Sequence, residues 1–256
     1  MDAVLAYKLF ASDTTTSLER IKEKPLVERN VEYYKENITS IKTADDLIDN
    51  NQIFGLITSA YGMEDMSYAK GFFKRLLKEG TDDPGSMANT LSDARYLEFA
   101  EDFNFLRTGE ATTAFDKVTV GVIDKYYQQS LEVEAGEQND GVRLAMYFER
   151  KAEEITSGYS ILADAALLKF VQTTFNLPSQ MSYQDLDTQV EMMAEKFDIA
   201  DLSDPDKVKD LVDRFLVNWD FQNPDTVAIS PLISQPSSLV NFSVDLLSSI
   251  QNIRSK

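Results

Sequence analysis

Pairs of acidic side chains are the first residues in this sequence whose spacing suggests chemistry. A glycosidase holds two carboxylates at a defined gap, and calcium is bound by several oxygens of one short loop. The acids that stand close enough in sequence are Asp45-Asp46, Asp82-Asp83, Glu153-Glu154 and the series Asp198, Asp201, Asp204 and Asp206. The chain has 43 acidic residues, so adjacent pairs also arise by chance, and helix caps and solvated faces explain most of them.

The composition removes further kinds of catalytic chemistry. The chain has no cysteine, which excludes thiolate nucleophiles and zinc ribbons, and no histidine, the usual general base and a common metal ligand. The series that begins at Asp198 is spaced by three and lacks the central glycine of an EF-hand loop. We therefore predict a non-enzymatic protein with no catalytic, cofactor-binding or metal-ligating residues.

The charge and the hydropathy pattern limit the partners of the chain. The formal net charge is −18 and the sequence pI is about 4.4. Nucleic acids and anionic membranes attract basic proteins, so we expect neither as a partner. The sequence has no uninterrupted run of about 18 apolar residues, and Met1 to Phe10 lacks the apolar centre of a secretory signal. We expect a soluble protein that does not insert into membranes.

The sequence resembles itself after a shift of 114 positions, which places the stretch 29–63 over 143–177. Apolar residues coincide along this overlap, and Tyr61 meets Phe175 at its end. The next residue is Gly62 in one copy and Asn176 in the other, and these two types best tolerate the left-handed conformation that closes a helix.

This register predicts an all-α fold with two tandem helical repeats, at about 29–105 and about 143–221. Glycine and proline total only 17 residues, as expected for helices with short connections. No linker is rich enough in glycine, proline or serine to separate two domains, so we expect the repeats to pack into one duplicated body over 1–235.

Local signals place several helix ends and loops. Ser203, ahead of Pro205, and the pair Ser92-Asp93 are typical of helix N-termini. The stretch from Gly136 to Gly141 is the best candidate for a loop between long helices. Residues 116–122 alternate between apolar and polar, but this strand signal is short and isolated.

Aromatic residues recur near the end of both predicted repeats. Under a shift of 116, Phe99 meets Phe215 and Phe103 meets Trp219, while Phe105 meets Phe221. A ligand pocket or a base-stacking platform would use such residues. Because the spacing is helical and recurs in both copies, we predict instead that Phe99, Phe103, Trp219 and Phe221 belong to the core.

The last segment, 236–256, is predicted to be a C-terminal amphipathic helix. Its apolar residues recur at helical spacing and form the candidate partner-docking set Leu239, Phe242, Leu246, Ile250 and Ile253. Two interpretations stay open. The stripe either packs onto the body of its own chain, for instance against the N-terminal arm, or binds a partner protein as an amphipathic helix in a groove.

Three groups of residues resemble a known family. They are Glu32-Tyr-Tyr-Lys-Glu-Asn-Ile38, Ala60-Tyr-Gly-Met63 followed by Met66-Ser-Tyr-Ala-Lys70, and Gly141-Val-Arg-Leu-Ala-Met-Tyr-Phe148. In order and spacing they are similar to domain-of-unknown-function family 1217. The resemblance covers nearly the whole chain and implies an alphaproteobacterial protein that is often encoded beside flagellar genes. It implies no reaction, cofactor or catalytic residue.

We therefore expect a non-enzymatic structural, assembly or regulatory protein associated with the bacterial flagellum, which acts through protein–protein contacts. The resemblance is compatible with a cytoplasmic location and with export through the flagellar apparatus without a cleaved signal peptide. The alternative is a helical module that binds a small molecule or a peptide in a cleft between the two repeats.

Overall fold

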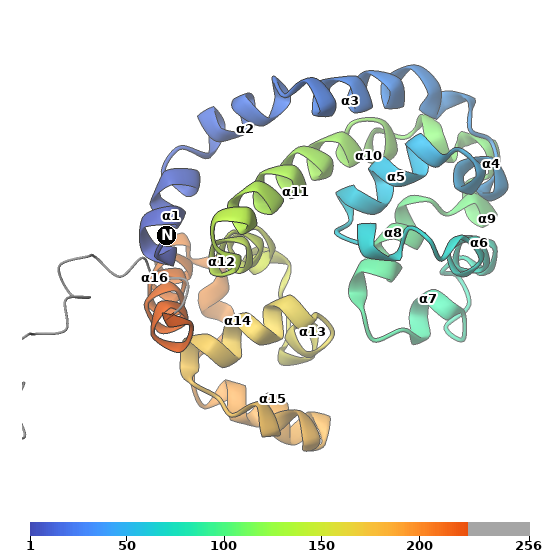
Figure 1. Cartoon of the computed structure of the whole chain (residues 1–256). Coiled ribbons are helices and arrows are strands. Elements are labelled where there is room, and N and C mark those ends of the chain that lie inside the picture. Colours follow the sequence, from blue (N-terminus) through green and yellow to red (C-terminus); the bar gives the residue numbers. More distant parts are fainter. Residues whose placement is uncertain (225–256) are drawn as a thin grey trace, which may run out of the picture.

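The computed structural model describes residues 1–224, and every regular element within this range is a helix (Figure 1). The predicted all-α class is confirmed for this part of the chain. The predicted C-terminal helix at 236–256, with its stripe from Leu239 to Ile253, lies outside the described residues.

The first three helices form a long arm along one side of the molecule (Figure 1). They are α1 (Ala3–Ala11), α2 (Thr14–Lys22) and α3 (Pro25–Asn37). Proline is well suited to the first position of α3, because it has no N–H to leave unbonded and its φ is already helical. The longer helix α11 (Gly121–Gln138) runs back beneath this arm and packs against α1 and α2.

Two groups of short helices lie on either side of α11. We call 44–108 the first half; it contains α4 (Ala44–Asp49), α5 (Asn51–Ala60), α6 (Lys70–Glu79), α7 (Met87–Thr90), α8 (Ala94–Asp102) and α9 (Phe105–Thr108). We call 140–222 the second half; it contains α12 (Asp140–Lys151), α13 (Gly158–Leu162), α14 (Ala165–Phe175), α15 (Leu186–Ala194) and α16 (Pro205–Gln222).

Short 3₁₀ turns and one further helix complete the described chain: η1 (Ile38–Ser40), η2 (Glu64–Met66), η3 (Gly109–Ala114), α10 (Asp116–Thr119), η4 (Ala152–Glu154), η5 (Ser179–Tyr183) and η6 (Ile199–Ser203). Helix α11 packs against α5 of the first half and against α12 of the second half. It is therefore the element on which both halves rest (Figure 1).

Each half is filled by aromatic rings, but the rings pack in different ways. In the first half Phe73 makes edge contacts with Phe54 and Phe99, with ring centroids 5.2 and 5.5 Å apart. In the second half Phe170 stacks between Phe148 and Phe215, at 3.7 and 4.4 Å. Both arrangements suit the charge distribution of aromatic rings when the rings are offset, and they bury a large apolar area.

Several element boundaries recur at the predicted spacing of 114 residues. α4 begins at Ala44 and α13 at Gly158, and α5 begins at Asn51 and α14 at Ala165. The turns that close α5 and α14 also agree, since Gly62 has a φ of 66° and Asn176, the non-glycine residue of positive φ in the described chain, a φ of 52°. The halves differ further on, because α8 ends at Asp102 whereas α16 continues to Gln222. The tandem duplication itself stays a prediction.

Two local predictions were wrong, and one side chain explains the first. The supposed loop 136–141 is a single residue, Asn139, between α11 and α12. Its side-chain oxygen accepts a hydrogen bond from the N–H of Gly141 at 2.8 Å, so the asparagine caps α12 without a longer connection.

The second wrong prediction concerns a helix start, whereas the dismissal of the weak strand signal agrees with the structure. The N-cap of α16 is Asp204, one residue after Ser203, because the Asp204 side chain bonds the N–H of Asp206 at 3.0 Å. The predicted cap at Asp93 is confirmed. The alternating stretch that begins at Asp116 starts with helix α10, since a strand needs a pairing partner and the described residues contain no strand.

The chain closes on itself through its first helix. α1 packs against α12 and α16, and the N–H of Ala3 donates to both carboxylate oxygens of Asp220, at 2.8 and 2.9 Å. A carboxylate at the N-terminus of a helix meets its unbonded N–H groups and the positive end of its dipole. The predicted N-terminal arm is therefore fixed to the second half through α1.

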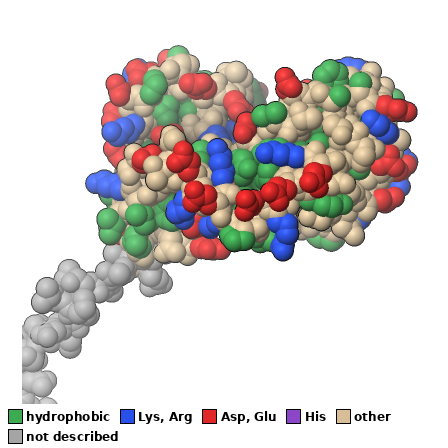
Figure 2. All heavy atoms as spheres, turned by 90° about the horizontal axis from the view of Figure 1, so that it is seen from above, with side chains coloured by type: hydrophobic (Ala, Val, Ile, Leu, Met, Phe, Trp, Pro, Cys, Tyr) green, Lys and Arg blue, Asp and Glu red, His purple; other side chains and the backbone are tan. Residues whose placement is uncertain are grey.

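Charged side chains of both signs cover the outer surface. In the view from above, acidic and basic residues are interspersed with apolar ones, and no patch of a single sign dominates this face (Figure 2). Neither the face that Figure 2 shows nor the fold singles out a surface for a polyanion or a polycation.

Gly141 provides a test of the packing between α12 and α16. A Cβ atom at this position would lie 2.5 Å from Cδ1 of Trp219, whereas a Cβ at Gly71 would have no neighbour within 4 Å. Both glycines are the second residue of a helix. We expect Gly141→Ala to lower the free energy of unfolding by about 1–3 kcal/mol, and Gly71→Ala to raise it by roughly 0.5–1 kcal/mol. Urea unfolding of both variants measures this, and equal effects would contradict the packing described.

Candidate functional site

Ion pairs connect α8 of the first half to α11 and α12. Lys125 of α11 bonds Glu98 at 2.7 Å and Asp102 at 2.8 Å, and Lys151 of α12 bonds Glu98 at 3.2 Å. Burial raises the pKa of Glu98, but the two lysines outweigh this effect and hold the pKa below its ordinary value. Glu98 is therefore an ionised link between the halves at neutral pH.

Tyr61 joins the same network at the end of α5. Its hydroxyl donates to Asp102 at 2.5 Å, and the ammonium group of Lys125 lies 4.4 Å from the centre of its ring. Burial and the neighbouring carboxylate raise the pKa of Tyr61, so the phenol keeps its proton. The end of α5 is thus fixed against α8 and α11 by a hydrogen bond and a cation–π contact.

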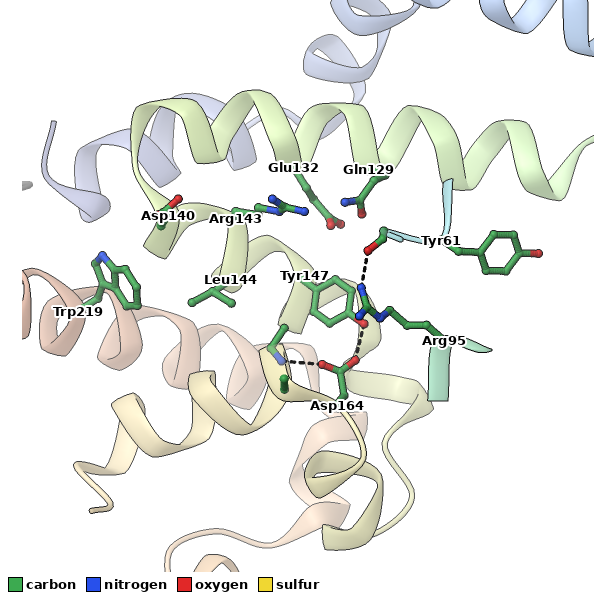
Figure 3. Close-up of a pocket in the computed structure, with 13 residues that line it drawn as sticks. Tyr61, Arg95, Gln129, Glu132, Asp140, Arg143, Leu144, Tyr147, Asp164 and Trp219 are labelled. Atoms are coloured by element: carbon green, nitrogen blue, oxygen red, sulfur yellow. Dashed lines mark hydrogen bonds between the residues drawn. The ribbon is translucent and has the colours of Figure 1, made fainter. Parts of the chain in front are cut away.

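A cavity lies beside this network, between the two halves, and we call it the inter-half cavity. Its volume is about 440 Å³, within the usual range for small-molecule sites. Residues from α5, α8, α11, α12, α14 and α16 line it: Tyr61, Gly62, Arg95, Gln129, Glu132, Asp140, Arg143, Leu144, Tyr147, Asp164, Ala165, Ala166 and Trp219 (Figure 3).

Arg95 stands on the first-half side of the cavity. Its Nε and Nη2 bond the carboxylate of Asp93, at 3.0 and 2.7 Å, and its Nη1 donates to the carbonyl oxygen of Gly62 (Figure 3). The left-handed conformation of Gly62 turns that carbonyl toward α8. The guanidinium of Arg95 is therefore held by the protein, which makes it a fixed wall of the cavity.

Tyr147 and Asp164 form the second-half side. Asp164 caps α14, because its Oδ1 accepts from the N–H groups of Ala166 and Leu167 at 2.8 and 3.1 Å. The hydroxyl of Tyr147 donates to the other oxygen of Asp164 at 2.5 Å (Figure 3). Burial, and then the charge of Asp164, raise the pKa of Tyr147, so this tyrosine stays neutral. A second cavity, of about 400 Å³, shares Arg95, Tyr147 and Asp164 with the first.

A buried acid, Glu132, lies on the face of α11 that roofs the cavity. Only 2% of its surface is exposed, and Arg150 bonds both its oxygens, at 2.6 and 3.0 Å. The amide of Gln129 bridges Glu132 and Arg143 when its nitrogen faces Glu132, with distances of 3.2 and 3.0 Å. Glu132 therefore has a charged partner, as the low dielectric of a protein interior requires.

The acid pairs that the sequence suggested do not meet at this site. Asp46 completes a capping box with Thr43, and Asp198 and Asp204 are caps of η6 and α16. Asp82 and Asp201 pair with Arg107 and Lys207. These acids therefore act as the predicted caps and surface pairs. Among residues 1–224 no group of three or more acids is arranged to hold a metal ion.

The four predicted core aromatics divide into three that are buried and one that is not. Phe99 and Phe103 are fully buried and Trp219 is 8% exposed, as predicted. Phe221 is 85% exposed, so its prediction was wrong. The reason is that α16 runs on as a regular helix, which turns Phe221 away from the face that carries Phe215 and Trp219.

Sequence reasoning missed the residues of the inter-half cavity. Arg143 occurs within a group that carries the family resemblance and Arg95 follows the predicted cap at Asp93, but nothing local marks them as neighbours. A usable signal existed in α11, where Gln129 and Glu132 are spaced by three on a helix side that otherwise carries apolar residues such as Tyr126. Polar residues at such positions indicate a buried polar contact.

Known proteins give a family and a fold but no activity. A family model described as a protein of unknown function (DUF1217) matches residues 60–208. The chain belongs to this family. A crystal structure of a protein from Agrobacterium tumefaciens is similar, with 44% sequence identity and a TM-score of 0.80 over 87% of this chain and 94% of that chain. No curated protein matches. In the described part of the chain, no helix is long and apolar enough to cross a membrane.

Glu98 gives the inter-half contact a pH dependence. Because its pKa is lowered on folding from an ordinary value of 4.5, Glu98 contributes stability above about pH 4.5, and this contribution is lost as the pH falls through the folded pKa. We expect Glu98→Gln to be less stable than the wild type at pH 7, with a difference that shrinks toward pH 3.

The control is Glu36→Gln, an exposed acid of α3. Urea unfolding of both variants between pH 3 and pH 7 measures the effect. A Glu98→Gln difference that stays constant over this range, or that matches Glu36→Gln, would exclude the proposed linkage.

Proposed function

We propose that this protein is a non-enzymatic binding module, which takes a small molecule or a short peptide segment into the inter-half cavity. The observation that supports this most strongly is the lining itself. Polar side chains of α8, α11 and α12, and of the residues that cap α5 and α14, converge on one space of about 440 Å³, beside apolar side chains such as Leu144 and Trp219. Ligand sites commonly combine apolar walls with a few convergent polar groups between packed helices.

The chemical state of the lining favours binding over reaction. The phenols of Tyr61 and Tyr147 stay protonated and donate to carboxylates. Asp164 caps a helix and Glu132 is bonded by Arg150. A general base needs a lone pair that is free to take a proton, whereas these carboxylates are already used as acceptors.

The position of the cavity gives binding a structural consequence. Its walls come from α5 and α8 on one side and from α12, α14 and α16 on the other. A ligand that contacts both sides stabilises their relative arrangement, because any species that binds only the folded form adds to its stability. Occupancy would therefore stiffen the contact between the halves.

We also propose that the protein serves the bacterial flagellum as a structural, assembly or regulatory component, in the cytoplasm or after export. Membership of the family supports this proposal through the resemblance described above. The two proposals are compatible, since a regulatory protein needs a signal to bind and a partner to act on. The tandem duplication belongs to the same proposal, because it would place equivalent helix ends on both sides of one cavity.

A ligand screen tests the binding proposal. We expect at least one compound in a screen of metabolites and short peptides to raise the melting temperature progressively as its concentration increases. A ligand at 100 times its Kd adds about 2.7 kcal/mol to the free energy of unfolding. Ala165→Phe, at an exposed alanine of the cavity wall, should remove the effect by filling the space.

The matched control is Ala111→Phe, also at an exposed alanine but outside the cavity. This variant should keep the ligand response of the wild type. A screen without any stabilising compound, or a response that survives in Ala165→Phe, would count against the inter-half cavity as the binding site.

A clean chromosomal deletion tests the flagellar proposal. We expect the deletion to change flagellar number, flagellar length or swimming speed, and we expect the wild-type chain supplied from a plasmid to restore them. Electron microscopy and tracking of swimming cells measure the outcome. Unchanged flagella and unchanged swimming would remove this proposal and leave the binding proposal intact.

A further inference from the structure

Two arginines line the inter-half cavity, and the protein satisfies only one of them. Arg95 is bonded through Nε, Nη1 and Nη2 to Asp93 and Gly62. Arg143 has a single acceptor among residues 1–224, the amide oxygen of Gln129 at 3.0 Å. A guanidinium carries five N–H donors, so most of those of Arg143 have no protein acceptor within the described chain.

The structure holds Arg143 in place although its donors are unused. Its stem crosses α11 at Gly136, where a Cβ atom would lie 3.1 Å from the Cδ of Arg143. From there the side chain points along the roof of the cavity toward Glu132 and Gln129 (Figure 3). The carboxylate of Glu132 pairs with Arg150, and within the described residues no hydrogen bond or ion pair joins it to Arg143.

Trp219 contributes an apolar surface to the cavity. The residue lines the cavity and is 8% exposed, but its Nε1 has almost no exposed surface and lies against Gly141, where a Cβ atom would be 2.7 Å from it. The indole therefore offers its ring to the cavity and not its N–H. The unmatched donors of the lining are those of Arg143, so a ligand that fits this lining has to bring acceptor oxygens.

The charges around the cavity limit the acceptor to a singly charged group. Asp140 and Asp164 lie on the same walls, and the whole chain carries a net charge of −18. A phosphate dianion would be repelled by these acids more strongly than one carboxylate, which a guanidinium binds through two parallel hydrogen bonds. The apolar surfaces of Leu144, Ala166 and Trp219 suit an apolar body on the ligand.

We propose that the inter-half cavity binds an organic carboxylate whose carboxyl group bonds Arg143 and whose apolar body lies against Leu144 and Trp219. The inference rests on the proposed binding function and names the class of ligand. Arg143 is the specificity-determining residue. The same chemistry is offered by a free carboxylic acid and by the C-terminal carboxylate of a peptide.

The test is calorimetric titration of the full chain with phenylacetate, 3-phenylpropionate and the N-acetylated dipeptide Ala-Phe, called Ala-Phe below, each compared with its neutral amide. We expect at least one acid to bind about 10-fold or more tightly than its amide, since a hydrogen bond between charged groups is worth that much. In Arg143→Met the acid should bind no better than the amide. Tighter binding by Ala-Phe than by the two free acids would identify a peptide terminus as the source.

The register of the chain supplies a matched control. Arg29 precedes Arg143 by 114 positions and occupies the corresponding place in α3, where it is exposed and lies outside the cavity. Arg29→Met should keep the affinity of the wild type. Gly136→Ala keeps the guanidinium but places a methyl group against the aliphatic part of Arg143. This variant should bind the acid less tightly than the wild type and the amide equally well. Urea midpoints of all variants show that each is folded.

Several results would overturn this assignment. They are equal binding of acids and amides, an affinity unchanged in Arg143→Met, tighter binding of inorganic phosphate than of the carboxylates, and no binding of any of the three acids. If amides bind and Ala165→Phe abolishes their binding, the cavity remains a binding site, and only the assignment of a carboxylate as its ligand is wrong. If the screen and the acids all fail, the proposed binding function fails with it.

Discussion

The burial of α11 on several sides at once is the constraint on which this structure depends. The helix lies under α2, carries α5 of the first half, and continues into the packing with α12 of the second half. On the sides that these neighbours cover, polar residues of the helix have no contact with water. Gln129 and Glu132 are 4% and 2% exposed, so each must find partners inside the protein. An unpaired carboxylate there would cost several kcal/mol.

Arg150 and Arg143 meet this requirement from α12, but they do so unequally. Arg150 compensates the charge of Glu132 through two hydrogen bonds. Among the described residues, Arg143 donates a hydrogen bond only to the amide oxygen of Gln129. Helix α12 therefore supplies two guanidinium groups next to α11, although the buried acid Glu132 pairs with only one of them. The other, that of Arg143, lies in the cavity between the halves. The cavity and its proposed specificity follow from how one central helix satisfies its polar groups.

The sequence predicts those parts of the fold whose causes are local. A glycine at 62 and an asparagine at 176 end their helices as expected, because the left-handed conformation depends on the residue itself. The cap at Asp93 was predictable for the same reason. Phe221 failed because helical rotation beyond Trp219 decides its exposure, and the aromatic pattern does not contain that information.

Apart from Gln129 and Glu132 on α11, the residues of the candidate site carry no local signal that predicts it. Arg95, Glu132 and Asp164 are distant in sequence, and they become neighbours only when both halves pack on α11. The short junction at Asn139 illustrates the same limit. Two glycines with polar residues between them indicate a loop, yet Gly136 lies within a helix where the stem of Arg143 crosses it, and Gly141 where the indole of Trp219 packs. Close tertiary contacts therefore account for glycine at these two positions, and the needs of a turn do not.

The bond between Ala3 and Asp220 has a consequence for how the molecule is made. The peptide N–H of Ala3, at the start of α1, bonds the carboxylate of Asp220, which lies 217 residues later in the sequence. During synthesis on the ribosome the first half can form its own aromatic core. The surfaces of α12 and α16 against which α1 packs are absent until both helices have left the ribosome. Contacts this distant in sequence slow folding. The first helix is therefore among the last to reach its final position. For most of translation, the side of α1 that is buried in the folded protein is in contact with solvent.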